Sequence, residues 1–330
     1  MTAPRTVAIT GATGFTGQAL ALRLARDGHR VRALARPGSE LPDHAGIVRI
    51  EGDLLDTDAL ARLVEGADTV FHIAAMFRKE GPYEEFLSVN FEGTKALVAA
   101  SRAAGVRRFV DCSTIGVHGS VADSPSDETA PFSPRDHYQE TKLMSEAFCR
   151  EEMARSGLEI VIIRPCAIYG PGDTRMLKMF KMVRRGTFFF AGDGSPNFHP
   201  VYIDDLVEAF VLAMDNEQAP GETFIIGGPR YLPLRDYVGA AARVLGRKPP
   251  LLYIPYRAMF HLARLVEAIC KPLGIEPPLH RRRLSFFKHN RAFTSAKAQR
   301  LMGYRPRIDI DEGFRRTVAW YRETGLLPPK

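Results

Sequence analysis

Three glycines stand where the first apolar run of the chain meets its first helical pattern. The run TVAIT (6–10) predicts a buried strand, and QALALRLARDG (18–28) predicts a helix after it. Between them, Gly11 permits a tight turn, Gly14 lets a pyrophosphate approach the backbone, and Gly17 lets the helix pack on the strand. A helix N-terminus offers free N–H groups and positive partial charge to phosphates. The sequence therefore predicts a dinucleotide site at this loop; an ordinary tight turn is the alternative.

The alternation of strand and helix continues through the first half of the chain. Helical patterns such as DALARLVEGA and FEGTKALVAASRAAG separate further apolar runs. These runs, each typical of a strand, are VRALAR (31–36), IVRIEGD (47–53), TVFHIAA (69–75), RRFVDCS (107–113) and IVIIRP (160–165). Strict alternation predicts a parallel sheet with helices on both faces. Right-handed crossovers make that sheet doubly wound, so we expect an α/β Rossmann fold.

The pattern loosens after residue 165. A turn, YGPGDTR, precedes the helical patterns LKMFKMVRRG and DDLVEAFVLAMD, and Pro-punctuated helices follow. This predicts a smaller, mostly helical C-terminal lobe over the carboxyl edge of the sheet, where doubly wound folds bind ligands. We assign 1–166 to a dinucleotide-binding domain, to which part of 200–226 returns. Residues 167–199 and 227–330 are assigned to a substrate-binding lobe.

Composition limits the class of protein. The 330 residues are 45% hydrophobic, which is enough for a full core, and no apolar run approaches the ~20 residues of a membrane span. The start of the chain has no signal-peptide layout. Four Cys without paired or metal-type spacing predict reduced thiols, no metal site and a cytoplasmic location. The net charge of +7 is mild and spread out, apart from HRRRL (280–284), so we expect no nucleic-acid partner.

The end of the second strand bears on which dinucleotide binds. NAD sites place an acidic residue there, about 20 residues beyond the glycines. This strand ends Leu34-Ala35-Arg36 and has no carboxylate. A guanidinium can hold a 2′-phosphate with two hydrogen bonds, which predicts NADP(H) in preference to NAD(H). Arg32 would assist if the strand alternates regularly; a solvated surface Arg36 is the alternative.

Tyr138 lies in HYQETK, and it is the one Tyr of ten that has a Lys four positions later. Tyr138 and Lys142 would share a helix face. A Lys ammonium favours phenolate, so we expect a Tyr138 pKa below the ordinary value of about 10. Such a phenol can give a proton to a carbonyl oxygen or take it back. The spacing alone is weak evidence, because a helix-face Tyr beside a surface Lys gives the same pattern.

These motifs, in this order, resemble the extended short-chain dehydrogenase/reductases over nearly all of the chain. TGATGFTG resembles the nucleotide loop of that family. The resemblance of this loop implies cofactor contacts at Gly11, Thr13, Gly14, Phe15, Thr16 and Gly17. GDLLD (52–56), HIAA (72–75) and RPCAIYGPGD (164–173) resemble further cofactor segments. They imply contacts at Asp53 and Leu54, at Ala74 and Ala75, and at Pro165 and Ile168.

The same resemblance implies the catalytic residues. CSTIGVHG (112–119) places the catalytic hydroxyl at Thr114, and HYQETK supplies Tyr138 and Lys142. Tyr138 would exchange the proton, Thr114 would hydrogen-bond the same oxygen, and Lys142 would also hold the nicotinamide ribose. Asn90, in NFEGTKAL, would be structural.

Four polar residues depart from the pattern or carry predictions of their own. His118 replaces the usual Tyr, and we interpret it as a pocket-wall or hydrogen-bonded residue rather than an extra base. His199, in HPVYIDDL, is either a substrate contact or structural. Asp204 and Asp205 predict caps for the helix that follows.

The reaction is narrowed by what the family contains: epimerases, dehydratases and dehydrogenases. Dehydratases carry Asp-Glu after the catalytic Thr, and here those positions are Ile115 and Gly116. Arg36 favours an exchangeable NADPH and net reduction. A nucleotide-sugar epimerase is the alternative, with the basic run at 280–283 holding a diphosphate. A non-catalytic dinucleotide-sensing protein is a second alternative, expected to show a broken triad.

The ending of the C-terminal lobe, PPLHRRRLSFFKHNRAFTSAKAQRLMGYRPRIDIDEGFRRTVAWYRETG (277–325), resembles that of 3β-hydroxysteroid dehydrogenases, sterol 4-carboxylate decarboxylating dehydrogenases and long-chain β-keto-acid reductases. With Phe188, Phe189 and Phe190 it predicts a bulky apolar substrate, steroid-like or a lipid-like β-keto compound; core packing is the alternative for each ring.

Two partners other than the substrate follow as expectations. Residues 256–272 would form an amphipathic helix with Arg257, Arg264 and Lys271, followed by Arg281 to Arg283. This predicts peripheral membrane contact of the lobe, with a solvated basic face as the alternative. Dimerisation through a helix pair is common in the family, so a homodimer stays open beside a monomer.

Overall fold

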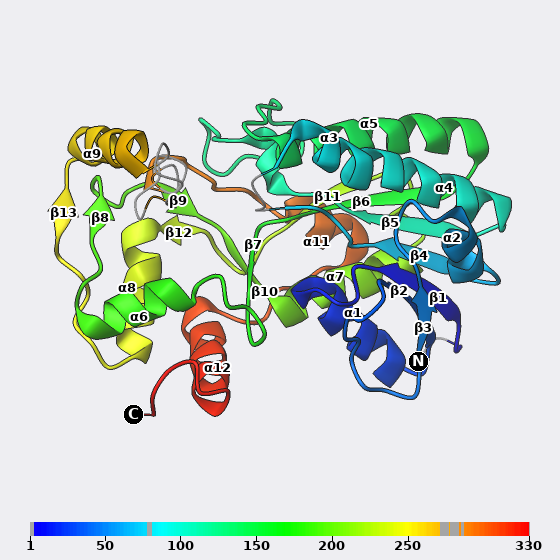
Figure 1. Cartoon of the computed structure of the whole chain (residues 1–330), viewed down its shortest axis with the longest axis horizontal. Helices are drawn as coiled ribbons and strands as arrows, with labels where there is room; N and C mark the ends of the chain where they lie inside the picture. The colour runs from blue at the N-terminus through cyan, green and yellow to red at the C-terminus, as the bar shows by residue number, and fades with distance from the viewer. Residues whose placement is uncertain (1–2, 78–80, 271–276, 278–283, 285–286, 330) are drawn as a thin grey trace.

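A seven-stranded parallel sheet forms the centre of the computed structural model, which describes residues 3–77, 81–270, 277, 284 and 287–329 (Figure 1). The strand order is β11-β6-β5-β4-β1-β2-β3, and all neighbouring pairs are parallel. The strands are β1 (Thr6–Thr10), β2 (Arg30–Ala35), β3 (Ile47–Glu51), β4 (Thr69–His72), β5 (Arg108–Cys112), β6 (Glu159–Pro165) and β11 (Thr223–Ile226). The chain order reverses between β1 and β4, where doubly wound sheets bind ligands. The predicted fold class is confirmed.

Helices cover both faces of the sheet because residues along each strand alternate between two cores. Val7 and Ile9 face one core, which includes α1 (Phe15–Arg26) and α7 (Ile203–Asp215). Ala8 faces the other core. The helices of that second core are α2 (Thr57–Val64), α4 (Gly93–Ala103) and α5 (His137–Ser156). Short helical segments precede α4 and follow β5: α3 (Tyr83–Phe86), η1 (Leu87–Glu92) and η2 (Ile115–His118).

Two strands end earlier than the sequence pattern predicts. The strand predicted over 47–53 ends at Glu51, and the one predicted over 69–75 ends at His72. Asp53 leaves the sheet because its carboxylate accepts a hydrogen bond from the Leu55 backbone N–H at 2.8 Å. Ala74 leaves it because its N–H donates to Oγ1 of Thr10 at 3.2 Å. Both departures lie at the carboxyl edge of the sheet.

In the part of the remaining chain that the structure describes, helices are joined by three short strand pairs. The helices are α6 (Leu177–Arg185), α8 (Leu234–Val244), α9 (Tyr256–Cys270), α11 (Ala296–Met302) and α12 (Ile310–Glu323). The pairs are β7 (Ala167–Tyr169) with β10 (Pro200–Tyr202), β9 (Asn197–Phe198) with β12 (Leu232–Pro233), and β8 (Phe190–Ala191) with β13 (Tyr253–Ile254). Phe188 and Phe190 are buried core residues with ring centroids 5.2 Å apart, so the core alternative is right for these two rings.

Segments distant in sequence meet across the sheet. β11 pairs with β6, α7 packs against α1, and α11 packs against both α7 and β11. The division into 1–166 with part of 200–226, and 167–199 with 227–330, remains a prediction. Within the described ranges, no helix is both long enough and apolar enough to cross a membrane.

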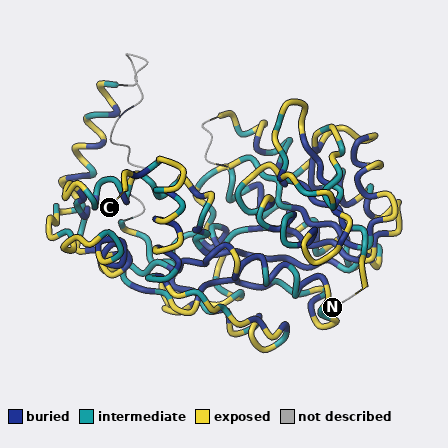
Figure 2. The backbone as a smooth tube through the Cα atoms, turned by 90° about the horizontal axis from the view of Figure 1, so that it is seen from below, coloured by how far each residue is buried: buried dark blue, intermediate teal, exposed yellow. Residues whose placement is uncertain are grey.

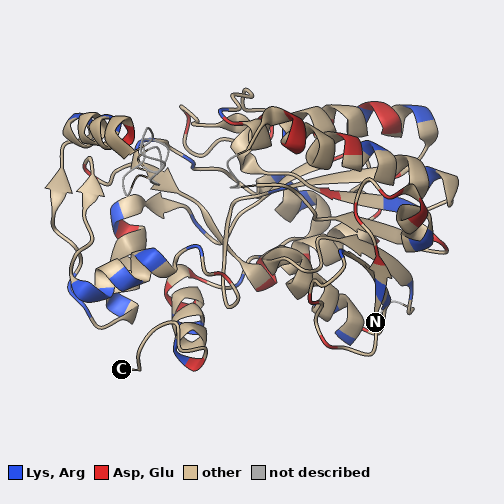
Figure 3. Ribbon diagram, viewed as in Figure 1, with Lys and Arg blue, Asp and Glu red and all other residues tan. Residues whose placement is uncertain are grey.

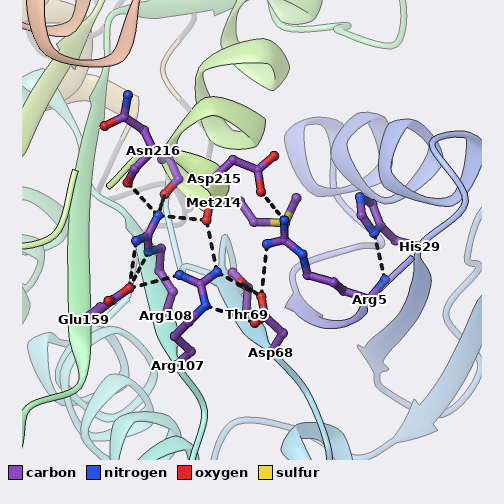
Figure 4. Close-up of polar contacts among 11 residues, drawn as sticks. Arg5, His29, Asp68, Thr69, Arg107, Arg108, Glu159, Met214, Asp215 and Asn216 are labelled. Atoms are coloured by element: carbon purple, nitrogen blue, oxygen red, sulfur yellow. Dashed lines mark hydrogen bonds and ion pairs between the residues drawn. The ribbon is translucent and has the colours of Figure 1, made fainter. Parts of the chain in front are cut away.

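Ion pairs and backbone hydrogen bonds fix the amino edge of the sheet, opposite the predicted site (Figure 4). Arg108, 2% exposed, donates to carbonyl oxygens at the C-terminal end of α7, including Met214 at 2.8 Å. Arg107 and Arg5 both pair with Asp68. Burial acts to raise the pKa of Asp68, but the hydrogen bonds from Arg107 and Arg5 outweigh it and lower that pKa to about 2. This edge is therefore occupied by structural contacts.

Candidate active site

The predicted site residues all follow the carboxyl ends of parallel strands or lie on the helix beside them. The glycine loop follows β1, Arg36 follows β2, and Asp53 and Leu54 follow β3. Ala74 and Ala75 follow β4, and Thr114 follows β5. Parallel strands end at one edge, so the fold gathers these positions there. Pro165 ends β6, and Ile168 lies in β7 just beyond it.

The glycine loop takes the close-packed geometry that its spacing predicts. Gly11 has φ +77°, and a Cβ there would lie 2.6 Å from the backbone nitrogen of Ala74. A Cβ at Gly17 would lie 2.2 Å from the Gly11 carbonyl oxygen. Helix α1 starts at Phe15 with no acidic residue in its first turn and no side-chain cap. Its exposed N–H end and the exposed Thr13 and Gly14 fit the pyrophosphate of a dinucleotide.

A chain of buried hydrogen bonds anchors the loop, and the sequence reasoning missed its central residue, His72. The ring joins Oγ1 of Thr10 at 2.8 Å to Oγ1 of Thr94 at 2.9 Å. Thr94 donates to the Asn90 carbonyl oxygen, so it accepts from His72, which then carries its proton on Nε2. Burial holds the pKa of His72 well below its ordinary range, and the Lys142 ammonium acts in the same direction. A polar residue ending a buried strand was the signal available.

Asn90 has the structural role expected of it. Its Oδ1 accepts a hydrogen bond from the Met76 backbone N–H at 2.7 Å, and its Nδ2 donates to the Met76 carbonyl oxygen at 3.1 Å. The same Nδ2 donates to Oγ1 of Thr141 on α5 at 3.0 Å. It therefore ties the segment after β4 to the helix that carries Tyr138.

Arg36 lies exposed at the end of β2, with no side-chain partner among the described residues. The turn that follows is held by Arg49 of β3, whose guanidinium donates to the carbonyl oxygens of Arg36 and Ser39. Arg32 does not assist, because its guanidinium donates to the carbonyl oxygens of Arg62 and Glu65 at the end of α2. The expectation for Arg32 is wrong for that reason.

The other predicted cofactor residues differ in exposure. Asp53 is exposed, whereas Leu54 is only 7% exposed and a Cβ on Gly93 would lie 2.9 Å from the Leu54 Cβ. Phe15 lies under the guanidinium of Arg175, 5.4 Å from its ring centroid. The loop after β7 therefore reaches the start of α1.

Thr114 lies at the start of η2, between β5 and α5. Its Oγ1 accepts a hydrogen bond from the backbone N–H of Gly116 at 3.0 Å, which leaves the hydroxyl proton to donate elsewhere. A Cβ placed on Gly116 would lie 3.1 Å from both Thr114 Oγ1 and Gln139 Cγ. Thr114 is therefore next to the first turn of α5. The neighbouring Ser113 already uses its hydroxyl proton, because it donates that proton to the buried carboxylate of Glu146.

Tyr138 and Lys142 lie one helical turn apart in α5, whose first turn is capped by Asp136. Tyr138 is half-buried, and its ring lies 5.9 Å from that of Phe77, which is 43% exposed. Lys142 is 1% exposed. The phenol thus lies between an apolar ring and a buried cation, and Phe77 is a neighbour that the sequence reasoning did not single out.

Lys142 has a buried counter-ion that the sequence reasoning missed, Asp111 of β5. The Lys142 Nζ lies 3.1 and 3.4 Å from the two carboxylate oxygens, and Asp111 is fully buried. Burial acts to lower the pKa of Lys142, but the Asp111 carboxylate outweighs it and raises that pKa. An acidic residue within the apolar stretch 109–112 of this strand, three positions before Thr114, was the signal in the sequence.

The predicted direction of the Tyr138 pKa is wrong for this structure. Burial raises the pKa of Tyr138 to about 12, and the lowering effect of Lys142 is the smaller one. Asp111 contributes to the outcome because its carboxylate opposes the field of Lys142 at the phenol. The Tyr138 phenol is therefore protonated at neutral pH.

A second buried ion pair lies next to the segment that carries Thr114, because its carboxylate accepts from Ser113. Glu146 of α5 and Arg164 of β6 are both at most 1% exposed and make two hydrogen bonds, of 2.9 and 2.6 Å. Arg164 also donates to Nε2 of His118 at 2.9 Å, and His118 stacks on Phe132. Burial lowers the pKa of His118, with Arg164 acting in the same direction. The interpretation of His118 as a hydrogen-bonded residue is confirmed.

His199 and the two aspartates after it have structural contacts. His199 is 4% exposed, and its Nε2 lies 3.1 Å from the Gly228 carbonyl oxygen. Asp205 does not cap α7: its carboxylate accepts from the backbone N–H groups of Arg307 and Ile308, at 3.0 and 3.1 Å. Asp204 does not cap the helix either, and its carboxylate pairs with Arg316 at 3.8 Å. The capping prediction is wrong because both aspartates sit inside the first turn, where Asp205 faces the segment before α12. Lys271 and the basic run at 280–283 lie outside the described residues.

Comparison with known proteins places this geometry in context. A profile of the NAD dependent epimerase/dehydratase family matches residues 7–227. The 3-beta-hydroxysteroid dehydrogenase of Mycolicibacterium neoaurum is 32% identical, over 96% of this chain and 91% of its own. The 2-alkyl-3-oxoalkanoate reductase of Stenotrophomonas maltophilia is 29% identical, over 95% and 98%. An epimerase structure from Methanothermobacter thermautotrophicus superposes with a TM-score of 0.80 at 26% identity, over 98% and 93%.

Proposed function

Since the chain belongs to the NAD dependent epimerase/dehydratase family and is an NAD(P)-dependent oxidoreductase of the short-chain dehydrogenase/reductase type, we propose that it interconverts a secondary alcohol and a ketone on a bulky hydrophobic substrate. The observation that carries the proposal is the position of Tyr138. Its phenol lies one helical turn from a buried ammonium and beside the exposed ring of Phe77.

The residues of the chain divide the work as follows. Tyr138 gives a proton to the carbonyl oxygen during reduction and takes it back from the alcohol during oxidation. Thr114 donates its free hydroxyl proton to the same oxygen, which stabilises the charge that develops there. Lys142, held protonated by Asp111, supplies a fixed positive charge one helical turn from Tyr138. A nicotinamide cofactor bound along this edge would supply the two-electron exchange with the carbon.

The proposed substrate class is a steroid-like or sterol-like molecule, or a lipid-like β-keto compound. Two relatives that match over nearly the whole chain are named for a hydroxysteroid and an oxoalkanoate. Phe77 provides an apolar surface 5.9 Å from the Tyr138 ring. We expect Phe77→Ala to raise KM for a bulky apolar ketone more than it lowers kcat, because a lost apolar contact weakens ground-state and transition-state binding alike.

We propose NADP(H) as the preferred cofactor, with Arg36 at the 2′-phosphate. Arg36 is exposed and occupies the position at which NAD sites carry an acidic residue. The guanidinium of Arg49 donates to the Arg36 carbonyl oxygen and so fixes the turn after β2. Isothermal titration calorimetry with NADPH and NADH tests this. Arg36→Ala should weaken NADPH binding about 10- to 100-fold, the size of a lost charge-assisted hydrogen bond, and leave NADH binding unchanged. Arg30→Ala, at the opposite end of β2, should change neither; equal binding of both nucleotides by the wild type would overturn the assignment.

A nucleotide-sugar epimerase is the second candidate, supported by the epimerase structure that superposes over 98% of this chain. An epimerase returns its substrate at the same oxidation state, so it needs no exchange of cofactor with solution. Purified protein that retains NAD, ignores NADPH and epimerises a UDP-sugar would favour this candidate over the reductase.

A further inference from the structure

Helix α9 presents three distinct faces along its length. One face is buried, with Met259, Ala263 and Glu267 against β8 and its neighbours. A second, at positions 262, 265 and 269, is apolar and exposed. Its side chains are Leu262 at 48%, Leu265 at 58% and Ile269 at 55% exposure. The helical spacing i, i+3, i+7 puts the three on one stripe. In Figure 2, α9 is the helix that leads into the longest grey trace, and it stands out from the body of the molecule.

Exposed apolar surface is concentrated at this end of the molecule. Nine large apolar side chains are exposed among the described residues, and six of them lie between 251 and 269. Besides the three on α9 they are Leu251 and Leu252, which come just before β13, and Tyr253, which lies in β13. A soluble surface carries such residues singly; a concentration of them marks a contact with an apolar partner. The helix lies at the end of the molecule farthest from the parallel sheet (Figure 1).

The exposed charges of the chain segment that carries this apolar stripe all have one sign. Between 247 and 270 the exposed charged residues are Arg247, Lys248, Arg257 and Arg264, and the single carboxylate, Glu267, is buried. Arg257 and Arg264, seven positions apart, lie on the helix face next to the apolar stripe. Helix α6, at the same end of the molecule, adds Lys178, Lys181, Arg184 and Arg185 without any acidic residue (Figure 3).

We propose that α9 lies in the surface of an anionic lipid bilayer, with Leu262, Leu265 and Ile269 in the acyl boundary and Arg257 and Arg264 at the headgroups. An in-plane amphipathic helix binds through buried apolar area together with attraction of its cations to anionic lipid. A protein partner would need a complementary acidic rim around an apolar groove, whereas a bilayer of anionic lipid provides both over any area. The proposal is independent of the proposed activity.

Co-sedimentation of the full-length purified protein with vesicles tests the proposal. The probes are phosphatidylcholine vesicles and phosphatidylcholine vesicles that contain phosphatidylglycerol. We expect binding to the anionic vesicles alone, weakened by added salt because surface charges are screened. Arg257→Gln with Arg264→Gln should weaken binding about 25-fold, roughly fivefold for each cation removed near the lipid surface. The matched control Arg26→Gln, an exposed arginine in the last turn of α1, should leave binding unchanged.

Leucine-to-serine substitutions separate a bilayer from a second copy of the chain. The double variant Leu262→Ser, Leu265→Ser should lose vesicle binding and keep the same mass in solution by light scattering. Leu55→Ser, equally exposed but near the end of β3, is the control and should still bind. Absence of binding to anionic vesicles by the wild type would overturn the proposal. So would a wild-type dimer that the double variant converts to a monomer, because the stripe would then be a self-association surface.

Discussion

The Lys142 ammonium lies 3.1 Å from Oδ1 of Asp111, with both side chains almost completely buried. A charge in the protein interior is tolerated when it is paired and hydrogen-bonded. Asp111 on β5 therefore decides whether Lys142 on α5 keeps its proton.

Asp111→Asn should destabilise the protein by about 3–5 kcal/mol near neutral pH, because it leaves a buried ammonium without a counter-charge. In the wild type the Lys142 pKa is raised, so its contribution is fully present below the ordinary Lys value of about 10.4 and is lost as pH rises through the folded value. In the variant the folded pKa falls below about 10.4, which reverses the sign: stability then rises with pH toward that value.

Denaturant unfolding at several pH values between about 7 and 10 measures this difference. The cost of Asp111→Asn should shrink steadily over that range. Asp58→Asn, an exposed acid in the first turn of α2, should cost at most about 1 kcal/mol and show no such slope. A cost for Asp111→Asn that is as small as this control, or that does not vary with pH, would mean that the pair is not the counter-ion system described.

The pKa of Tyr138, raised to about 12, predicts an asymmetry between the two directions of the reaction. Oxidation needs the phenolate, so kcat/KM for the alcohol should rise about tenfold per pH unit through the neutral and mildly alkaline range. Reduction needs the phenol, so kcat/KM for the ketone should stay flat over the same range. Initial rates across pH in both directions give the answer. An oxidation profile that levels off near neutral pH contradicts a raised Tyr138 pKa.

Two substitutions of Thr114 separate the contribution of its hydroxyl to activity from the contribution of its volume. Thr114→Ser keeps the hydroxyl and should retain most of kcat/KM. Thr114→Val keeps the volume, removes the donor to the reacting oxygen, and should lower kcat by about 10²–10³-fold. Thermal unfolding of both variants controls for the hydrogen bond that Thr114 accepts from Gly116. Equal activity of the serine and valine variants would remove Thr114 from the reaction.

Substitution of Glu146 tests how much the buried Glu146–Arg164 ion pair contributes to the stability of the protein. Glu146→Gln should cost about 3–5 kcal/mol of stability, since Arg164 is then buried without its carboxylate. Glu140→Gln, on the same helix but in a partly exposed pair with His137, should cost no more than about 1 kcal/mol. Chemical denaturation of both variants compares them directly. Similar costs for the two would show that the Glu146–Arg164 pair contributes little.

Local chemistry made much of this molecule predictable. A glycine loop between a strand and a helix has one common geometry, and the alternation of strands and helices gives the parallel sheet. The spacing of Tyr138 and Lys142 fixes them one turn apart whatever else the chain does. Hence the fold class, the carboxyl edge as the place of the site, and the position of these two residues one turn apart were accessible from the sequence.

What the sequence could not give depends on contacts between distant segments. Asp111 is 31 positions from Lys142, and Asp205 is about 100 positions from the backbone N–H groups that it accepts from. Neither pairing follows from spacing. The pKa of Tyr138 is raised, whereas the sequence predicted a lowered value, for the same reason. The lowering effect of Lys142 is local, but burial and the opposing charge of Asp111 come from the tertiary structure.

The proposed reaction requires Tyr138 to transfer a proton to the oxygen of a hydrophobic ketone. The most direct measurement is the rate of NADPH consumption with steroid and β-keto lipid ketones, for the wild type, Tyr138→Phe and the control Tyr256→Phe on α9. We predict turnover by the wild type and by Tyr256→Phe, and a loss of about 10²–10⁴-fold in kcat for Tyr138→Phe with NADPH binding retained by calorimetry. Undiminished reduction by Tyr138→Phe would contradict the claim.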